Sequence, residues 1–193
     1  IIREVAAKVD KQSALDILQD DGGVTKVLDL KPEKYDAVYE ACEVLLNGDQ
    51  IFPAMLDAIR AAEKTITFET YIYWSETIGR EFSEALMERA RAGVKVHVML
   101  DFMGSMKMDL AQIDAMKKAG VEVQRYHKPV WWKLARLNNR THRKLLVIDG
   151  KVGYTGGVGI ADQWRGNAQD EHHWRDTHFR IDHRVVGQIQ AVF

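Results

Sequence analysis

The sequence predicts an α/β domain organised around one largely parallel sheet. Short runs rich in Val, Ile, Thr and aromatic residues alternate with amphipathic stretches of helical period. Gly93 and Gly120 follow two of these stretches, at the place where a helix often ends in a left-handed residue. The chain has 193 residues, 46% of them hydrophobic, which is enough for one sizeable core. Strand–helix–strand order favours parallel neighbours joined by right-handed crossovers.

The first part of the chain is expected to differ from the rest. Residues 1–42 are predicted to form an N-terminal helical segment, and residues 43–193 the main domain. The main domain is expected to start with a short strand over 43–46 and a turn at Asn47-Gly48. Asp49 is then expected to cap a helix that buries one apolar face.

The middle of the chain carries the strand–helix alternation. β-branched and aromatic residues indicate strands, and apolar positions three and four residues apart indicate helices. The expected strands are 65–73, 94–100 and 121–126, and the expected helices are 77–92 and 109–119.

A hairpin and one further strand complete the expected sheet. The hairpin pairs 142–149 with 151–155 around an Asp149-Gly150 turn, and the last strand is 175–182. The chain starts with Ile rather than Met and ends in what resembles an interrupted helix. We therefore expect it to be a piece of a longer protein, with its C-terminal helix truncated.

His142 and Lys144 stand two residues apart at the start of the hairpin. Successive side chains of a strand point to opposite faces, so these two share a face and Arg143 points away. An imidazole can attack phosphorus while an adjacent ammonium neutralises the phosphoryl oxygens. The pair therefore predicts catalysis on a phosphate ester, and the alternative is a polar strand end without a function.

The spacing of His142, Lys144 and Asp149 resembles the His-x-Lys-x4-Asp signature of the phospholipase D superfamily. Other stretches, in the same order along the chain, resemble its cardiolipin synthase-like branch. They are 67–73, 92–98, 155–157 and 174–180, and the similarity covers residues 44–193. The resemblance implies a phospholipase D-like α-β-α sandwich with a mixed, largely parallel sheet.

The resemblance also implies a mechanism and a partner. Members of the family carry two copies of the signature, or pair two chains, and this chain has one copy. One histidine attacks the phospholipid to give a phosphohistidine, and the histidine of the second copy protonates the leaving alcohol. No metal or other cofactor is implied. The sequence leaves open which histidine is the nucleophile, and which alcohol is the acceptor.

Two aspartates are expected to have different roles. Asp149 lies at the hairpin turn, on the strand face opposite His142, and is predicted to be structural. Asp176 is predicted to orient His142, because a carboxylate that accepts from one ring nitrogen fixes the tautomer. The resemblance places an acidic residue on this strand, and the alternative is an ordinary surface aspartate.

A glycine-rich segment follows the hairpin. Gly156 and Gly157 are predicted to let backbone N–H groups approach the phosphate, together with Lys144. The family commonly has Ser and Asn side chains here, whereas this chain has Gly157 and Gly159. Backbone contacts or a second copy would have to supply the missing donors, and tight packing is the alternative reason for the glycines.

Basic residues and a tryptophan pair occur together before the signature. Trp131 and Trp132 are predicted to contact a membrane at headgroup level, with Lys133 and Arg136 attracting anionic lipid. A solvated loop that packs its tryptophans on the core explains the same pattern equally well. The expected partners are an anionic, phosphatidylglycerol-like phospholipid and a membrane surface, with a second phospholipase D-like half or a homodimer partner.

Composition excludes several other classes. The net charge is −1, whereas a dedicated nucleic-acid binder is usually basic, so no nucleic acid is expected. A single cysteine excludes an internal disulfide. No apolar run is long enough to span a bilayer, so any membrane anchor is expected outside this chain. His172, His173 and His178 with Glu171 could suggest a metal site, but the resemblance implies metal-independent chemistry.

The sequence therefore predicts a cardiolipin synthase-like phosphatidyltransferase, peripheral on the bacterial inner membrane. Two alternatives remain open. One is a hydrolase or nuclease of the same superfamily, completed by dimerisation. The other is a membrane-binding module that has lost catalysis, against which the intact His142, Lys144 and Asp176 argue.

Overall fold

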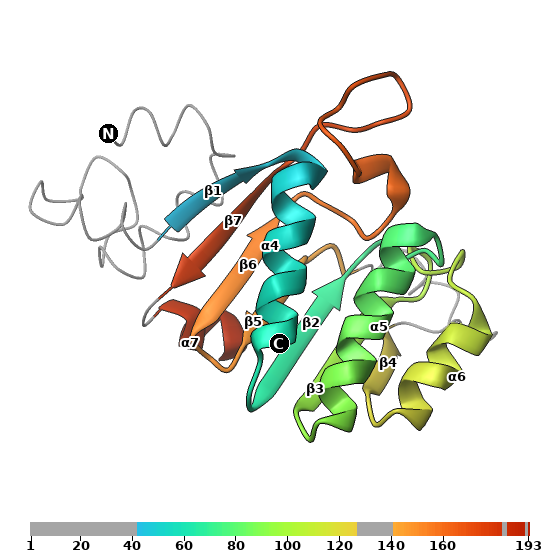
Figure 1. Cartoon of the computed structure of the whole chain (residues 1–193), viewed down its shortest axis with the longest axis vertical. Coiled ribbons are helices and arrows are strands. Elements are labelled where there is room, and N and C mark those ends of the chain that lie inside the picture. The colour runs from blue at the N-terminus through green and yellow to red at the C-terminus, as the bar shows by residue number, and fades with distance from the viewer. Residues whose placement is uncertain (1–41, 127–140, 183–184, 192) are drawn as a thin grey trace, which may run out of the picture.

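A computed structural model describes residues 42–126, 141–182, 185–191 and 193 (Figure 1). Nearly all of the predicted N-terminal helical segment therefore lies outside the described residues. The strands are β1 (Cys42–Leu46), β2 (Thr65–Thr70), β3 (Lys95–Asp101), β4 (Glu122–Tyr126), β5 (Leu145–Ile148), β6 (Val152–Gly156) and β7 (Thr177–Asp182). The helices are α4 (Asn47–Ala61), α5 (Thr77–Arg91), α6 (Leu110–Lys118) and α7 (Val185–Ala191), with a short 3-10 turn at Asp162–Trp164.

The seven strands form one mixed sheet in the order β1-β7-β6-β5-β2-β3-β4. β2, β3 and β4 pair in parallel, whereas the other four pairings are antiparallel. Only β5 and β7 consequently run against the direction of the other strands. The sheet is mixed, as predicted, but it is not largely parallel in its pairings, since only those among β2, β3 and β4 are parallel.

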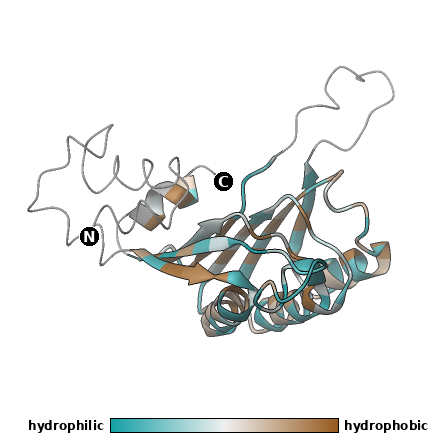
Figure 2. Cartoon of the chain, turned by 90° about the horizontal axis from the view of Figure 1, so that it is seen from above, coloured by the Kyte–Doolittle hydropathy of each residue, from teal (hydrophilic) through white to brown (hydrophobic). Residues whose placement is uncertain are grey.

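Helices cover both faces of the sheet, as an α-β-α sandwich requires. α4, α5 and α6 lie on one face, and α7 lies on the other (Figures 1 and 2). The larger core lies beneath the three helices, where Phe52 and Phe68 each pack on Phe82 with ring centroids 5.9 Å apart. A smaller cluster of Val147, Phe179, Ile181 and Val186 lies on the α7 side.

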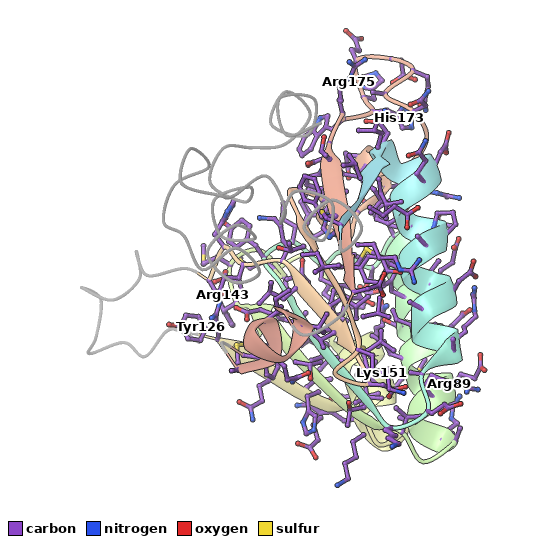
Figure 3. The ribbon with its side chains drawn as sticks, turned by 90° about the vertical axis from the view of Figure 1, so that its left-hand side faces the viewer. Arg89, Tyr126, Arg143, Lys151, His173 and Arg175 are labelled. Carbon is purple, nitrogen blue, oxygen red and sulfur yellow. The ribbon has the colours of Figure 1, made fainter. Side chains whose placement is uncertain are left out.

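The two ends of the strands form two different edges. Since β5 and β7 are reversed, their first residues lie beside the last residues of the other five strands. We call this the carboxyl edge: Leu46, Thr70, Asp101, Tyr126, Leu145, Gly156 and Thr177. The amino edge is the opposite one: Cys42, Thr65, Lys95, Glu122, Ile148, Val152 and Asp182. In Figure 3, Arg175 lies at one end of the molecule and Lys151 towards the other.

Three expected element boundaries are wrong. The hairpin strand begins at Leu145 rather than at position 142, because buried carboxylates instead of a partner strand hold the residues before it. β2 ends at Thr70, and beyond it Tyr73 makes one isolated bridge with Ile160. The last strand starts at Thr177 rather than at position 175.

Asp49 does not cap α4, contrary to the prediction. The helix begins at Asn47, whose φ is 56°, and no side chain caps its first turn. Asn47 instead reaches across the domain: its Nδ2 donates to Asn167 Oδ1 at 2.6 Å, and its Oδ1 accepts from the backbone of Asp176 at 3.1 Å. The helix start is thus fixed by a contact with the segment that precedes β7.

Candidate active site

His142 and Lys144 lie next to each other at the carboxyl edge, just before β5. Lys144 Nζ lies 3.2 Å from His142 Nδ1 and donates to the His142 carbonyl at 3.0 Å. The imidazole is exposed, and one side of it faces the Tyr71 ring, with centroids 5.0 Å apart. The sequence predicts that these two side chains share a face, and the structure brings them together in extended chain outside the strand.

The surroundings of this pair lower both pKa values. Partial burial and the Lys144 charge lower the pKa of His142, and the Asp101 carboxylate opposes them. Burial also lowers the pKa of Lys144, and the Asp176 carboxylate opposes that shift. A lowered pKa keeps the imidazole neutral at neutral pH, which is the form that can attack phosphorus.

Glu69, a buried carboxylate near the end of β2, holds the segment that presents His142. Its Oε1 accepts from the Thr141 hydroxyl and from Arg143 Nε at 3.1 Å. Arg143 Nη2 also lies 3.0 Å from Glu69 Oε2, so the two side chains form an ion pair. The residues on both sides of His142 are thereby attached to β2.

Asp101 is the second buried carboxylate at this edge, at the end of β3. Its Oδ2 accepts from the backbone N–H of Thr141 at 3.1 Å. Its Oδ1 accepts from the backbone N–H groups of Met103 and Gly104 at 2.9 and 3.0 Å. The sequence reasoning missed Glu69 and Asp101, although an acidic residue at the end of an apolar strand is a visible signal.

Asp176 lies beside the glycine segment that follows β6. Its Oδ2 accepts from Trp164 Nε1 at 2.9 Å, and its Oδ1 accepts from the Thr177 N–H at 2.8 Å. Among the described residues its carboxylate makes no hydrogen bond to His142, and its charge acts on Lys144 instead. Its role in orienting His142 therefore stays a prediction.

Two glycines allow the backbone to pass close to polar side chains here. A Cβ on Gly157 would lie 2.2 Å from Asp176 Oδ1, and one on Gly156 would lie 2.5 Å from His178 Nδ1. Any larger residue would displace one of these groups. Close packing thus explains both glycines, and phosphate binding by their N–H groups stays a prediction.

His178 is a buried histidine that the sequence reasoning treated as unimportant. Only 1% of it is exposed, and its Nδ1 has no hydrogen-bond partner among the residues that the structure describes. Burial, and then the Lys144 charge, lower the pKa of His178 to about 3. It is consequently neutral at any physiological pH and packs against the glycine segment through Gly156, its partner in the β6–β7 ladder.

Asp149 lies at the other edge of the sheet, in the turn between β5 and β6. Its two oxygens accept backbone N–H bonds of 2.9, 2.7 and 2.8 Å from Glu63, Lys64 and Thr65, which lead into β2. Burial would raise its pKa, but these three donors and Lys151 together hold the pKa below its ordinary value. The whole length of β5 separates Asp149 from His142.

Some predicted residues are not brought to this site. Trp131, Trp132, Lys133 and Arg136 lie outside the described residues. His172 and His173 pair with Glu171 and Asp170 on an exposed loop, and His178 is buried elsewhere. Within the described ranges, no group of His, Cys, Asp and Glu side chains could hold a metal ion. No helix in those ranges is long and apolar enough to cross a membrane.

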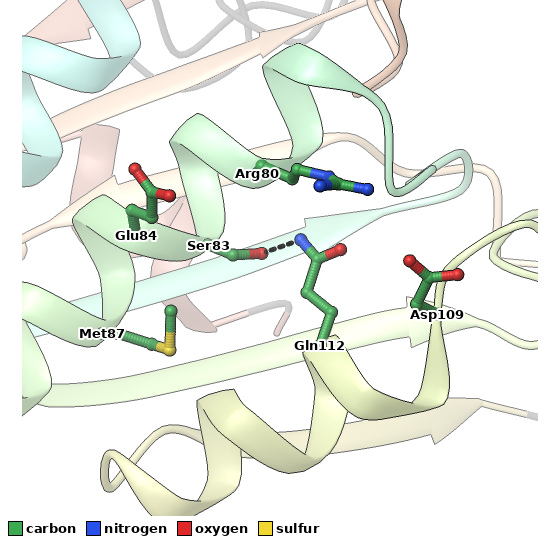
Figure 4. Close-up of a pocket in the computed structure, with 6 residues that line it drawn as sticks. All are labelled: Arg80, Ser83, Glu84, Met87, Asp109 and Gln112. Carbon is green, nitrogen blue, oxygen red and sulfur yellow. Dashed lines mark hydrogen bonds between the residues drawn. The ribbon is translucent and has the colours of Figure 1, made fainter.

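A hollow between α5 and α6 lies on the helix-covered face (Figure 4). Its volume is about 230 Å³, and it is lined by Arg80, Ser83, Glu84, Met87, Asp109 and Gln112. Gln112 Nε2 donates to Ser83 Oγ at 2.6 Å and to the Gly79 carbonyl at 3.0 Å. These inner polar groups are already paired with each other, so we assign the hollow no part in the site.

Sequence comparisons point to one family. A family model described as "Cardiolipin synthase, PLD-like domain" matches residues 55–190. Cardiolipin synthase 1 of Bacillus cereus is 36% identical over 153 residues, which cover 78% of this chain and 30% of that protein. Cardiolipin synthase A of Pseudomonas syringae is 36% identical over 152 residues, which cover 78% and 32%. The chain thus spans about 30% of the length of the curated relatives that it matches.

Solved structures show the same fold at lower identity. Phosphatidylserine synthase of Haemophilus influenzae aligns with a TM-score of 0.62 and 16% identity, over 79% of this chain and 35% of that one. The phospholipase D family member Nuc of Salmonella typhimurium aligns with a TM-score of 0.58 and 16% identity, over 78% of this chain and 90% of that one. At such identity these likenesses concern the fold alone.

Proposed function

Because the chain belongs to the family of phospholipase D-like domains of cardiolipin synthases, we propose that it carries one half of a phosphatidyltransferase active site. The observation that supports this most is the contact of 3.2 Å between Lys144 Nζ and His142 Nδ1 at an exposed edge of the sheet. A neutral nucleophile and a cation side by side suit a phosphodiester, whose own negative charge repels nucleophiles.

In the proposed first step, an unprotonated ring nitrogen of His142 attacks the phosphorus of a phosphatidylglycerol-like donor. A P–N bond forms as the P–O bond to the leaving alcohol breaks, and that alcohol takes a proton from a second acid. Lys144 neutralises the non-bridging oxygens throughout. The N–H groups of Gly156 and Gly157 are proposed to contact the same oxygens.

The second step returns the enzyme to its starting state. An incoming alcohol gives its proton to the group that acted as the acid, and its oxygen attacks phosphorus as the P–N bond breaks. A second phosphatidylglycerol-like lipid as acceptor gives transfer, and water gives hydrolysis. Asp176 is proposed to orient His142 once substrate is bound, since apo contacts at active sites often tighten in the complex.

One histidine cannot be both the nucleophile and the acid in the same step. We therefore propose that a second phospholipase D-like half, or a second copy of this chain, supplies the acid. The chain is proposed to act at a membrane surface, peripheral on the bacterial inner membrane. Its four predicted contact residues between positions 131 and 136 lie outside the described residues.

The test is to trap the covalent intermediate in the active assembly, either the parent protein or a dimer. Reaction with phosphatidylglycerol, quenched with denaturant at mildly alkaline pH because acid hydrolyses a P–N bond, should give a phosphatidyl adduct on His142, detected by peptide mass spectrometry. His142→Ala should give neither adduct nor turnover, whereas His172→Ala, at an exposed histidine of the loop before β7, should give both. EDTA should have no effect.

Three results would contradict the proposal. One is an adduct on another residue. Another is full turnover in His142→Ala, and the third is robust transfer by a demonstrated monomer of this chain. Cleavage of DNA without any phospholipid turnover would instead indicate a nuclease of the same superfamily.

A further inference from the structure

Within the described part of the chain, the exposed large apolar side chains all lie at one edge of the sheet. Among the described residues they are Leu46, Met103, Met106, Leu110, Tyr126 and Trp174. Leu46 and Tyr126 end the two outermost strands at the carboxyl edge, and the other four lie in loops or at a helix start beside that edge. At the amino edge, the exposed residues include Glu63, Lys64 and Lys151 but none of these apolar types.

The three most closely grouped of these side chains belong to one segment, residues 102–110, which we call the β3–α6 loop. Met106 is 61% exposed and Leu110, the first residue of α6, is 69% exposed, with Met103 at 40%. Such exposure of apolar side chains is notable in a loop that also buries Gly104, Ser105 and Met108. The apolar side chains are therefore held outwards by a loop that is itself packed on the domain.

This loop is fastened to the structure around His142. Asp101, which accepts the Thr141 N–H, also accepts the N–H groups of Met103 and Gly104. Trp74 Nε1 donates to the Gly104 carbonyl at 3.1 Å. A Cβ on Gly104 would lie 2.0 Å from the carbonyl oxygen of Tyr71, the residue whose ring faces His142. The loop and the catalytic histidine therefore share one support.

We propose that the β3–α6 loop is a membrane-docking element that inserts Met103, Met106 and Leu110 among the lipids of an anionic bilayer. Lys107 lies at the middle of the loop, exposed, with its Nζ 3.8 Å above the Trp74 ring. It supplies the cation that an anionic headgroup layer attracts. In the sequence, this element is distinct from the segment for which membrane contact is predicted at Trp131 and Trp132.

A bilayer, rather than a protein partner, is the expected binding surface because of the position of His142. This step rests on the proposed function. The phosphorus of a phospholipid stays tied to acyl chains in the hydrocarbon, and the headgroup layer on each side is only about 5–8 Å thick. His142 must therefore come that close to the hydrocarbon, and its neighbours at the carboxyl edge come with it. Single apolar side chains spread along an edge also fit shallow insertion better than one tight protein interface.

The experiment measures binding of the chain to vesicles of equimolar phosphatidylglycerol and phosphatidylcholine by co-sedimentation. The double variant Met103→Gln, Met106→Gln keeps size and charge and should bind about tenfold more weakly, since two half-exposed apolar side chains lose their lipid contact. Lys107→Gln should bind about fivefold more weakly, the equivalent of ~1 kcal/mol per surface cation.

Lys64→Gln is the matched control, because it removes the same charge from the amino edge. It should bind vesicles as the wild type does, and circular dichroism should show all three variants folded. Equal losses in Lys64→Gln and Lys107→Gln would overturn the proposal by showing a response to net charge alone. Wild-type binding by the methionine variant, with weaker binding only in Trp131→Ala, Trp132→Ala, would overturn it too.

Two further readouts separate this proposal from others. Loss of self-association in the methionine variant, with vesicle binding intact, would show a protein interface and overturn it. Turnover of a soluble short-chain phospholipid by the active assembly should be unchanged in the variant. If that substrate is not turned over even by the wild-type assembly, the proposed function fails, while loop-dependent vesicle binding would still support the docking element.

Discussion

The two edges of the sheet differ in the kinds of side chain that they bury and expose. At the carboxyl edge the chain buries Glu69, Asp101 and His178 and exposes large apolar side chains, and each of these choices lowers stability unless a partner compensates. At the amino edge it uses a tight turn, in which Asp149 accepts three backbone N–H bonds. The difference suggests that the carboxyl edge is organised for chemistry and the amino edge for holding the sheet together.

The difference between the two edges is clearest along β5, which runs from one edge to the other. Its four residues, Leu145–Ile148, separate the segment of His142 and Lys144 from Asp149. The same signature thus places the proposed reacting groups at one edge and, at the other, an aspartate that accepts three backbone N–H bonds. Substitutions at its two ends should consequently affect different properties.

The largest effect is expected for Lys144→Met, which keeps the length of the side chain but removes its charge. Turnover by the active assembly should fall by about 10³-fold or more, because a cation at the phosphoryl oxygens is lost. The free energy of unfolding should not fall, since burial already disfavours the ammonium. Steady-state kinetics measures the turnover, and urea unfolding measures the free energy of unfolding. Wild-type turnover, or strong destabilisation of the variant, would contradict the view that Lys144 serves chemistry rather than stability.

Asp149→Asn tests the amino edge with the opposite expectation. The free energy of unfolding should fall by about 2 kcal/mol, because three backbone donors lose a charged acceptor at a partly exposed turn. Turnover per folded molecule should be unchanged. The pKa of Asp149 is lowered in the folded chain, so its stabilisation is present above the unfolded pKa and is lost as pH falls through the folded one. A kinetic defect without a stability defect would place Asp149 in the chemistry.

His178, which is buried near the carboxyl edge, should make the free energy of unfolding depend on pH. Its pKa falls from 6.5 to about 3 on folding, so the unfolded chain binds a proton that the folded chain does not. Stability is therefore lost as pH falls below 6.5, by about 2 kcal/mol at pH 5. His178→Gln should have a shallower slope between pH 7.5 and pH 5 than the wild type, measured by urea unfolding at each pH. Identical slopes would show that the other titrating groups account for the whole effect.

Sequence alone was a good guide to the elements and a poorer one to their ends. The alternation of strands and helices predicts an α/β domain, because apolar residues recur with the period of the element that buries them, and the family resemblance implies the α-β-α layers. The start of β5 was placed three residues early. Residues 142–144 look like strand by composition, but Glu69 holds Arg143 and Asp101 holds the preceding Thr141, and no local pattern reveals such long-range partners.

The residues of the candidate site also differ in how far the sequence predicts them. His142 and Lys144 could be found because their contact arises from positions two apart in extended chain. Glu69 and Asp101 could be noticed as acidic residues at strand ends, but their contacts with Thr141 could not be predicted. Those contacts arise only because the sheet order places β2 beside β5 and the end of β3 one strand further on. The exposed methionines were missed for a related reason: apolar residues in a loop look like core until burial is known.

Because β1 pairs with β7, the first strand of the sheet can find its partner only late in synthesis. Leu46 pairs with Thr177, and 177 − 46 = 131 residues separate them, so this ladder can form only after nearly all of the domain has left the ribosome. The same ladder brings Asp176 beside Asn47, through a 2.9 Å bond from the Asn47 N–H to the Asp176 carbonyl. A nascent chain that already displays His142 and Lys144 therefore still lacks Asp176 in its place. The closing strand therefore forms late, and a chain that ends before position 176 would display His142 and Lys144 without the aspartate that is proposed to orient His142.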